Sequence, residues 1–413
     1  MHNYKTSFEP QNDRYLFLDM NSFFANCEQQ VNPVLRGKPL VVAPYTGNTG
    51  CCIAVSYEAK ALGIKTGMGV GEAKKIIRNL IVVESNPSLY REIHHHIVDI
   101  ISQFTPWLTI KSVDEMVFPL SSYEKGGDRP IKLVFKIKQK LKEELGEWLT
   151  ASVGVGSNIF WAKQAAEEKK PDGLTIIRLK DIPNHLKDWQ LTDLKGINTH
   201  MERRLKYLGI NTPSDLYSSS PQILREKLGI AGEYWQLRLR GYDIDTAPIK
   251  RSSVGNSCVL PPEARNWHTA KQVVHKLVER AGERLRIKKL EARGVVLVVR
   301  FLGKGKWHQY LRTKSFSDSQ TFWSYAELLW QKMLITSTTA KQKPILIAIT
   351  AVNVAHQTGE QLELFNSINK SKLIFEALDL INTRFGDWTL KPASLIGADE
   401  YAPSRIPFGN TQL

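Results

Sequence analysis

Three carboxylates in this sequence follow or join segments that are patterned as β-strands. Asp19 ends a strand-like apolar run. Asp114 and Glu115 lie between two stretches whose apolar side chains alternate, 108–110 and 116–118. Because alternation is typical of strands, we expect the acidic pair at the tip of a hairpin. Adjacent strands lie about 4.8 Å apart, so pairing of this hairpin with the strand before Asp19 would bring the three carboxylates together.

Carboxylates on neighbouring rigid elements suit phosphoryl or nucleotidyl transfer. These reactions need divalent ions that hold the attacking and leaving oxygens in line. Mg²⁺ usually takes one or two protein carboxylates per ion, so two ions need about three. A solvated strand end is the ordinary explanation for any one such residue, whereas the three together favour a metal site.

The elements that must position these residues change along the chain. Strand-like and helical patterns alternate up to residue 177, which indicates a mixed α/β core. Short helices with glycine breaks at Gly196, Gly209 and Gly229 follow over 181–240. The next hundred residues predict a separately folding β-α-β-β-α-β unit. Its expected helices and later strands are 267–288, 294–302, 307–314, 320–335 and 344–353, and one amphipathic helix lies beyond it.

Length and composition limit the class of protein. A chain of 413 residues suits two to four domains, and 42% apolar and 23% charged residues are typical of soluble globular proteins. No apolar run reaches the roughly 20 residues that cross a bilayer, and the polar start lacks a signal-peptide core. We therefore expect a cytoplasmic protein with no membrane partner. Four cysteines without CxxC spacing make a zinc site unlikely on sequence grounds.

Positive charge is concentrated in one part of the chain. The formal net charge is +15, and residues 250–318 hold sixteen Lys and Arg against five Asp and Glu. A solvated helix face is the ordinary explanation for basic residues. Here the strands carry them too, which favours a folded surface that meets a polyanion such as nucleic acid.

Five blocks, in order, resemble the signatures of the Y-family DNA polymerases. Residues 19–28 (DMNSFFANCE) resemble the opening D-x-D/N-x-F-Y/F-A-x-x-E, and 112–115 (SVDE) resemble S-x-D-E. Residues 56–64 (SYEAKALGI) are similar to the fingers motif, and 152–156 (SVGVG) and 170–173 (KPDG) match two further blocks. The resemblance spans about residues 15–400.

The resemblance implies an α+β multidomain, right-hand polymerase. The expected parts are a palm (1–25 and 80–178), fingers (26–79), a helical thumb with a helix-hairpin-helix (179–245) and a β-α-β-β-α-β little finger (250–355). The C-terminal segment, 356–413, would carry a clamp-binding motif.

The resemblance also implies residue roles. Asp19, Asp114 and Glu115 would be catalytic and would hold two Mg²⁺ ions, with the Met20 carbonyl as a further ligand. The nucleotide would meet Phe23, Phe24, Tyr57, Lys60 and Lys170. Phe24 stands at the steric-gate position, where an aromatic ring excludes the 2′-OH of a ribonucleotide. A hydroxyl and two cations suit a triphosphate.

Several positions depart from the family pattern. Asn21 replaces the second Asp of the DinB type and resembles the UmuC type, which leaves the subfamily open. Lys60 replaces the commoner Arg, so a point charge replaces a bidentate contact. Ile159 stands where relatives often have Lys. The run His94, His95 and His96 points around a helix and not to one point, so we interpret it as a partly solvated helix face.

Further segments suggest how DNA and a clamp would be held. Residues 194–198 (LKGIN) look like the hairpin of a helix-hairpin-helix, with Lys195 and Gly196 near a phosphate; an ordinary helix turn fits equally well. In the basic unit the expected phosphate contacts are Lys304, Lys306, Arg312 and Lys314. Residues 361–365 (QLELF) resemble the bacterial sliding-clamp motif, with anchors Gln361, Leu362, Leu364 and Phe365. The alternative for this motif is a loop that packs on the protein.

The function that these resemblances imply is template-directed DNA synthesis across lesions, in DNA damage tolerance, repair and the SOS response. The expected partners are primer–template DNA, dNTP and the sliding clamp, with SOS accessory subunits or a recombinase as further candidates. A non-catalytic accessory protein that scaffolds DNA and clamp is the alternative, although such relatives lose the carboxylates. A nucleotide cyclase with a related palm would need neither a thumb nor a basic little finger.

Overall fold

The chain folds as two compact units. The computed structural model describes residues 9–244, 252–303, 305–336, 342–356, 370–386, 388–395 and 401. The first unit comprises Met1–Ala247 with Arg405–Leu413, and the second comprises Pro248–Ser404. Within the described ranges, no helix is both long and apolar enough to span a bilayer.

A five-stranded sheet forms the centre of the first unit. Its strands lie in the order β5-β6-β1-β7-β8. They are β1 (Tyr15–Met20), β5 (Thr109–Ile110), β6 (Glu115–Pro119), β7 (Ala151–Gly156) and β8 (Leu174–Ile177). β1 pairs antiparallel with β6, which puts Asp19 opposite Glu115, and on its other side with β7, which puts Asp19 opposite Ser152. The pairing of β1 with the hairpin strand, which the sequence left open, is therefore present.

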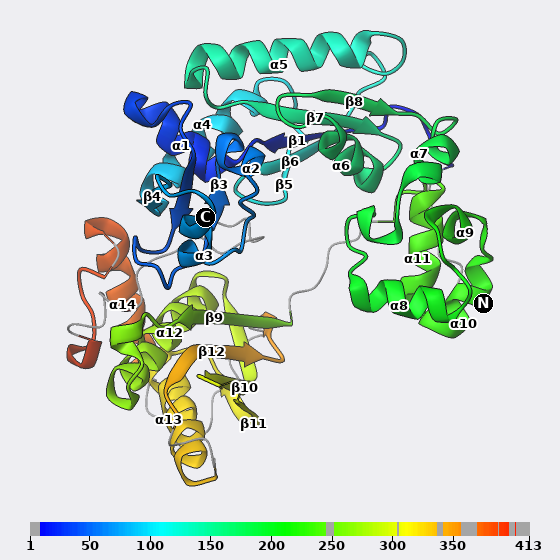
Figure 1. The fold of residues 1–413 in the computed structure, drawn as a ribbon. Coiled ribbons are helices and arrows are strands. Elements are labelled where there is room, and N and C mark those ends of the chain that lie inside the picture. Colours follow the sequence, from blue (N-terminus) through cyan, green and yellow to red (C-terminus); the bar gives the residue numbers. More distant parts are fainter. Residues whose placement is uncertain are drawn as a thin grey trace. The chain divides into compact units, whose positions relative to one another are not determined.

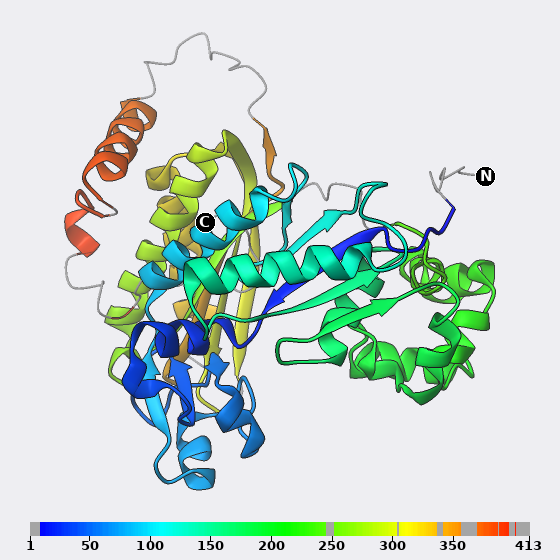
Figure 2. The ribbon, with the colours of Figure 1, turned by 90° about the horizontal axis from the view of Figure 1, so that it is seen from above.

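Helices cover both faces of this sheet. On one face lie α4 (Pro87–Ser102) and α5 (Arg129–Leu145), and on the other lies α6 (Ile159–Glu168) (Figure 1). The same helices are seen from above in Figure 2. Leu16 and Leu18 belong to the core with α4 and α5, whereas Phe17 packs with α6. Because side chains alternate along a strand, Asp19 lies on the α6 side with Phe17.

Two glycines let α6 approach the sheet closely. A Cβ atom on Gly154 would lie 2.0 Å from the Ala162 carbonyl oxygen, and one on Gly156 would lie 2.4 Å from the Ala162 nitrogen. Only glycine fits at such distances. The SVGVG block thus brings α6 and its charged residues beside the strand end that carries Asp19.

A smaller sheet adjoins α1 (Phe23–Val31) and the 3-10 helix η1 (Pro33–Leu35). Its order is β3-β2-β4. The strands are β2 (Leu40–Ala43), β3 (Ala54–Val55) and β4 (Ile81–Glu84), and the helices packed with them are α2 (Tyr57–Ala61) and α3 (Val70–Ile76). The Ser56 hydroxyl caps α2 by accepting from the Ala59 N–H at 3.3 Å, a role for which serine is strongly preferred. The cap fixes where α2 begins, and so where Tyr57 projects.

A group of short helices follows β8. They are α7 (Ile182–Asp188), η2 (Leu191–Asp193), α8 (Thr199–Tyr207), α9 (Pro213–Ser218), α10 (Pro221–Leu228) and α11 (Ile230–Leu239). The breaks expected at Gly196, Gly209 and Gly229 are present, and all three glycines have positive φ. The apolar core of this group includes Phe160 and Trp161 of α6, so the group packs against the central sheet through that helix.

The second unit contains the expected β-α-β-β-α-β order. Its elements are β9 (Ser253–Val259), η3 (Pro262–Ala264), α12 (Trp267–Ile287), β10 (Leu290–Phe301), β11 (Lys306–Phe316), α13 (Ser319–Thr336), β12 (Pro344–Val352) and β13 (Ala355–His356). The sheet order β11-β10-β12-β9 leaves β11 at an edge. One face packs on α12 and α13. Beyond it lie α14 (Lys370–Phe385), the expected amphipathic helix, and η5 (Ala393–Leu395).

Candidate active site at the end of strand β1

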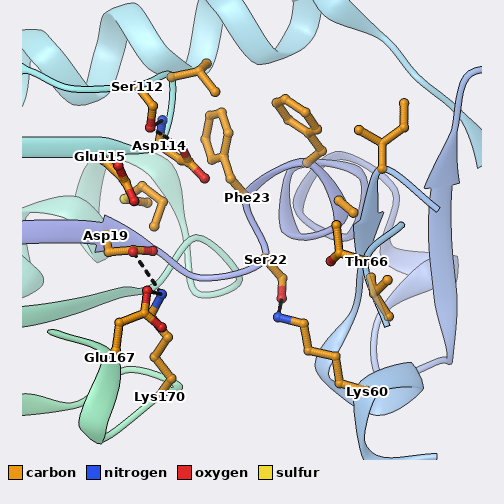
Figure 3. A pocket seen from close by; sticks show the side chains of 16 residues that line it. Asp19, Ser22, Phe23, Lys60, Thr66, Ser112, Asp114, Glu115, Glu167 and Lys170 are labelled. Carbon is orange, nitrogen blue, oxygen red and sulfur yellow. Dashed lines mark hydrogen bonds and ion pairs between the residues drawn. The ribbon is translucent and has the colours of Figure 1, made fainter. Parts of the chain in front are cut away.

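A cavity of about 280 Å³ lies where β1 ends and α1 begins. Most of the residues that the sequence singled out line it: Asp19, Met20, Phe23, Phe24, Lys60, Asp114, Glu115 and Lys170. The carboxylates gather on one side, and Lys60 reaches in from α2 (Figure 3). Tyr57 lies beside the cavity and does not line it.

Asp19 is buried and paired with a lysine. The residue is 6% exposed, and its Oδ2 atom lies 2.9 Å from Lys170 Nζ. Burial raises the pKa of Asp19 to about 6, although the Lys170 ammonium opposes the rise. Burial also acts against the charge on Lys170, but the carboxylates of Asp19 and Glu167 outweigh it and raise the Lys170 pKa. A charged lysine therefore stays next to a carboxyl whose own charge is disfavoured.

The acidic pair at the hairpin has separate partners. The Ser112 hydroxyl donates a short hydrogen bond to Asp114, and burial raises the pKa of Asp114 despite this bond. Glu115 Oε1 lies 2.7 Å from Lys163 Nζ on α6. Each of the three carboxylates thus has a donor from the protein itself.

The donor set fits a hard divalent cation. In the described part of the chain, no three acidic, histidine or cysteine side chains converge closely enough to hold an ion. Yet three carboxylates share one cavity wall, and Mg²⁺ takes hard oxygen ligands. Burial raises the pKa of both Asp19 and Asp114, so a cation in the cavity would stabilise their ionised forms. In the structure, the ammonium groups of Lys170 and Lys163 pair with Asp19 and Glu115.

Two side chains of α2 contact the strand end. Lys60 Nζ donates to Ser22 Oγ at 2.8 Å and lies 4.4 Å from the centre of the Tyr57 ring. The Tyr57 hydroxyl donates to Asn21 Oδ1 at 3.3 Å. Burial, and then the nearby charge of Lys170, lower the pKa of Lys60.

The Phe24 ring is held in place by stacking. Its centre lies 4.3 Å from the centre of the Tyr90 ring, with the planes 16° apart. The Tyr90 hydroxyl donates to Glu28 at 2.7 Å, which fixes the tyrosine in turn. The cavity wall therefore carries, at Phe24, a ring that is packed from behind.

Comparison with known proteins covers both units. The impB/mucB/samB family matches residues 18–167, and its C-terminal domain matches residues 251–364. The DNA polymerase IV of Pelotomaculum thermopropionicum is 30% identical over 387 residues, which cover 91% of this chain and 93% of the relative. The chain belongs to the Y family of DNA polymerases.

Other relatives agree. The DNA polymerase IV 1 of Bacillus subtilis is 29% identical over 411 residues, 95% of each chain. The Y-family chimera Dbh-Dpo4(243-245)-Dbh has a TM-score of 0.72 at 25% identity, and DinB from Sulfolobus solfataricus has 0.53 at 26% identity. Each of these two comparisons covers 83% of this chain and 100% of the other. The subfamily that the sequence left open is the DinB type, despite Asn21.

Two charged residues of this Y-family site were not found from the sequence. Lys163 and Glu167 lie on α6, where a spacing of four residues puts both on one face. Glu167 lines the cavity and is 3.2 Å from Lys170. The spacing alone could have marked the pair, but only the close approach of α6 to β7 shows what the pair contacts.

The histidine run is a partly solvated helix face, as expected. His95 and His96 are exposed, and His94 is buried. Its Nδ1 atom lies 2.8 Å from the Val113 carbonyl. Since α4 packs against the sheet, one residue of the run faces inward, and it supports the turn before Asp114.

The expected DNA contacts fall in three places. The Lys195 N–H donates to Gln164 on α6 at 3.0 Å, so this amide is already used, while its ammonium lies 3.5 Å from Glu167. Gly196 has φ +103, as a tight hairpin requires. On the edge strand β11 three basic side chains alternate outward and are exposed: Lys306, Arg312 and Lys314. Lys304 and the clamp-motif residues Gln361, Leu362, Leu364 and Phe365 lie outside the described residues.

Proposed function

We propose that this protein is a template-directed DNA polymerase that performs translesion synthesis. The observation that carries the proposal is the cavity itself: the carboxylates of two separate family motifs share one wall, and lysines of two further motifs reach it. Relatives named DNA polymerase IV align with this chain over more than 90% of their own length, and they support the same activity. A scaffold without catalysis would not need this arrangement.

The metal-binding role falls to Asp19, Asp114 and Glu115, with the Met20 carbonyl beside them. We propose two Mg²⁺ ions, because three carboxylates match that number. Bound ions would neutralise the triphosphate and hold the attacking and leaving oxygens in line. The protein's own part is to present ionised carboxylates. For this, Lys163 must release Glu115 and Lys170 must release Asp19.

The triphosphate would be held from two sides. Lys170 lies on the carboxylate side and Lys60 on the fingers side, so the two cations flank the cavity. Lys60 would exchange the neutral Ser22 hydroxyl, and Lys170 the Asp19 carboxylate, for phosphate oxygens. Hydrogen bonds between ionised groups are stronger than those between neutral groups. Phe23 and Phe24 would pack against the sugar and base, with Phe24 as the gate.

The remaining parts would hold DNA. We assign residues 1–25 and 80–178 to the palm, 26–79 to the fingers, 179–245 to the thumb and 250–355 to the little finger. The exposed basic row on β11, Lys195 and Gly196 would bind phosphates of the primer–template without reading its sequence. A ternary complex of the Dbh polymerase, which is 25% identical to this chain, supports binding of DNA and nucleotide together.

The sequence QLELF at 361–365 supports a clamp partner. Leu and Phe anchors next to a hydrogen-bonding Gln can occupy a preformed apolar pocket. Deletion of these five residues should abolish stimulation of synthesis by a bacterial sliding clamp and leave clamp-independent synthesis unchanged. Equal stimulation of both proteins would remove this assignment.

Primer extension tests the proposed activity. Wild type should extend a primer with Mg²⁺ and dNTPs, and Asp114→Ala should be at least 1,000-fold slower because a metal ligand is lost. Failure of the wild type on every template, with or without clamp, would favour the scaffold.

A further inference from the structure

Asn21 makes side-chain contacts to three residues, although it lies between two residues that line the cavity. It is 1% exposed. Its Nδ2 atom donates to Thr150 Oγ1 at 2.9 Å, and its backbone N–H donates to the Thr150 carbonyl at 2.9 Å. Its Oδ1 atom accepts from the Ser152 hydroxyl at 2.8 Å and from the Tyr57 hydroxyl at 3.3 Å. The side chain thus joins the start of β7 to α2.

The neighbouring residue makes a parallel contact. Ser22 has φ +43 and ψ +43, a left-handed conformation at the start of α1. Its hydroxyl accepts from Lys60 at 2.8 Å. Two consecutive residues after β1 therefore hold two side chains of α2: Lys60, which lines the cavity, and Tyr57, which lies beside it.

We propose that Asn21 and Ser22 are positioning residues that set the Tyr57 hydroxyl and the Lys60 ammonium for the incoming triphosphate. The proposal rests on the polymerase function above. Neither residue needs to touch the reacting atoms. Their effect would be to hold α2 in register with the strand that carries Asp19, so that less ordering is left for the nucleotide to impose.

The chemistry of both side chains suits this task. An amide supplies a donor and an acceptor at once, and it adds no negative charge two residues from Asp19. The Ser22 hydroxyl is a neutral partner for Lys60. A phosphate oxygen forms a stronger, charge-assisted hydrogen bond, so when nucleotide binds Lys60 can leave Ser22, and the Tyr57 hydroxyl can turn its one proton from Asn21 to the phosphate. A carboxylate in place of Ser22 would compete with the substrate.

A double-mutant cycle tests the proposal through the KM for dNTP. Asn21→Ala and Tyr57→Phe should each raise KM about three- to tenfold, as expected for one lost hydrogen bond, and change kcat less than twofold. The double variant should be no worse than the poorer single variant, because Asn21 acts through the Tyr57 hydroxyl. Asn21→Asp keeps an acceptor for Tyr57 but loses the Nδ2 donor to Thr150 and adds a buried negative charge, so its KM should lie between those of the wild type and Asn21→Ala.

The matched control is Tyr15→Phe. It removes a buried tyrosine hydroxyl of the same unit, which donates to Asp243 at 2.6 Å and does not line the cavity. Its KM should stay unchanged. If Asn21→Ala does not fold, the same cycle with Ser22→Ala and Lys60→Met decides, and non-additive rises in KM are expected there too.

Additive effects in the cycle, or a fall in kcat at constant KM, would overturn the positioning role while the wild-type polymerase activity stands. An inactive wild type would overturn both the polymerase function and the positioning role. The two failures are therefore distinguishable from one set of assays.

Discussion

At the scale of single residues, the site keeps its carboxylates in a buried environment, which disfavours their ionised forms. Asp19 contacts Lys170, Glu115 contacts Lys163, and Asp114 accepts from Ser112. Buried charges are costly unless they are paired. Burial still raises the pKa of Asp19 and of Asp114, and a bound divalent cation would stabilise their ionised forms.

Asp19→Asn should stabilise the metal-free protein while it abolishes synthesis. The Asp19 pKa in the fold is about 6, above its ordinary 3.8, so ionisation destabilises the fold as pH rises through this interval. The neutral amide of Asn cannot ionise, so the variant does not lose this stability as pH rises. At pH 8 with EDTA we expect a gain of about 1–3 kcal/mol in the free energy of unfolding, measured by urea denaturation.

The pH dependence gives this prediction its control. The gain should be small at pH 4, grow up to about pH 6 and stay constant above, because the wild-type carboxyl is then ionised. Asp99→Asn, at an exposed position of α4, should change the unfolding free energy at pH 8 by less than about 0.5 kcal/mol. A variant that is less stable than wild type at pH 8 would contradict the burial argument.

Phe24→Ala should admit ribonucleotides. The ring that lines the cavity is held by its stacking on Tyr90, so the wild-type wall cannot yield to a 2′-OH. Discrimination between dNTP and rNTP, measured as a ratio of kcat/KM values, should fall at least tenfold. Phe24→Tyr keeps a ring and should preserve it. Equal discrimination by the alanine variant would remove the gate assignment.

The residues found from the sequence were those inside motifs. Asp19, Asp114 and Lys170 could be marked because residue type, order and spacing all agree. Lys163 and Glu167 could not, because their charges gain meaning only from what they contact. His94 is similar: its neighbours are solvated, and only the packing of α4 separates it from them.

At the scale of elements, the approach of α6 to β7 decides the shape of the site. The periodic patterns were enough to predict both elements, but they left open whether β1 pairs with β6. The patterns gave no measure of the distance between helix and sheet. That distance is short because Gly154 and Gly156 have no Cβ atom to contact α6. Most strand ends shifted by a residue or two, and β10 begins at Leu290, four residues before the expected start at 294, since hydrogen-bonded ends are set by partners and not by pattern.

Gly154→Ala should strongly destabilise the first unit. The new Cβ would lie 2.0 Å from the Ala162 carbonyl oxygen, so α6 must move away from the sheet. We expect a loss of about 3 kcal/mol or more in unfolding free energy, together with lower activity, because Lys163 and Glu167 move with the helix.

Gly69→Ala is the matched control for this change. Its Cβ would find no atom nearer than 4.0 Å, and the backbone there has φ −64. Its unfolding free energy should stay within about 0.5 kcal/mol of wild type. Equal losses in both variants would mean that the close contact with α6 is not the cause.

At the scale of the whole molecule, the two units differ in charge, because most of the excess of basic residues lies in the second unit. The basic block read from the sequence lies in the second unit, where the edge strand β11 presents exposed basic residues on the face away from α12 and α13. Composition could locate this block along the chain. It could not show that Lys306 and Arg312 share one face, which follows from strand register, or that Lys314 is exposed in the irregular stretch after Arg312.

Removal of this row should weaken DNA binding without changing sequence preference. Replacement of Lys306, Arg312 and Lys314 by Gln should lower affinity for any duplex and reduce the slope of log K against log salt by about 0.7–0.9 per charge. Fluorescence anisotropy across a salt series measures both. The same replacement at exposed positions of α5, Lys132, Lys136 and Lys142, is the control; an equal effect there would mean that net charge alone is responsible.

The most direct measurement of the central claim is extension of a primer across a single abasic site. Wild type should insert opposite the site and continue, and should also copy the undamaged template, with Mg²⁺ and all four dNTPs. Asp114→Ala should extend neither template. Extension that stops before the abasic site would contradict lesion bypass, and synthesis by Asp114→Ala at the wild-type rate would contradict the site at the end of β1.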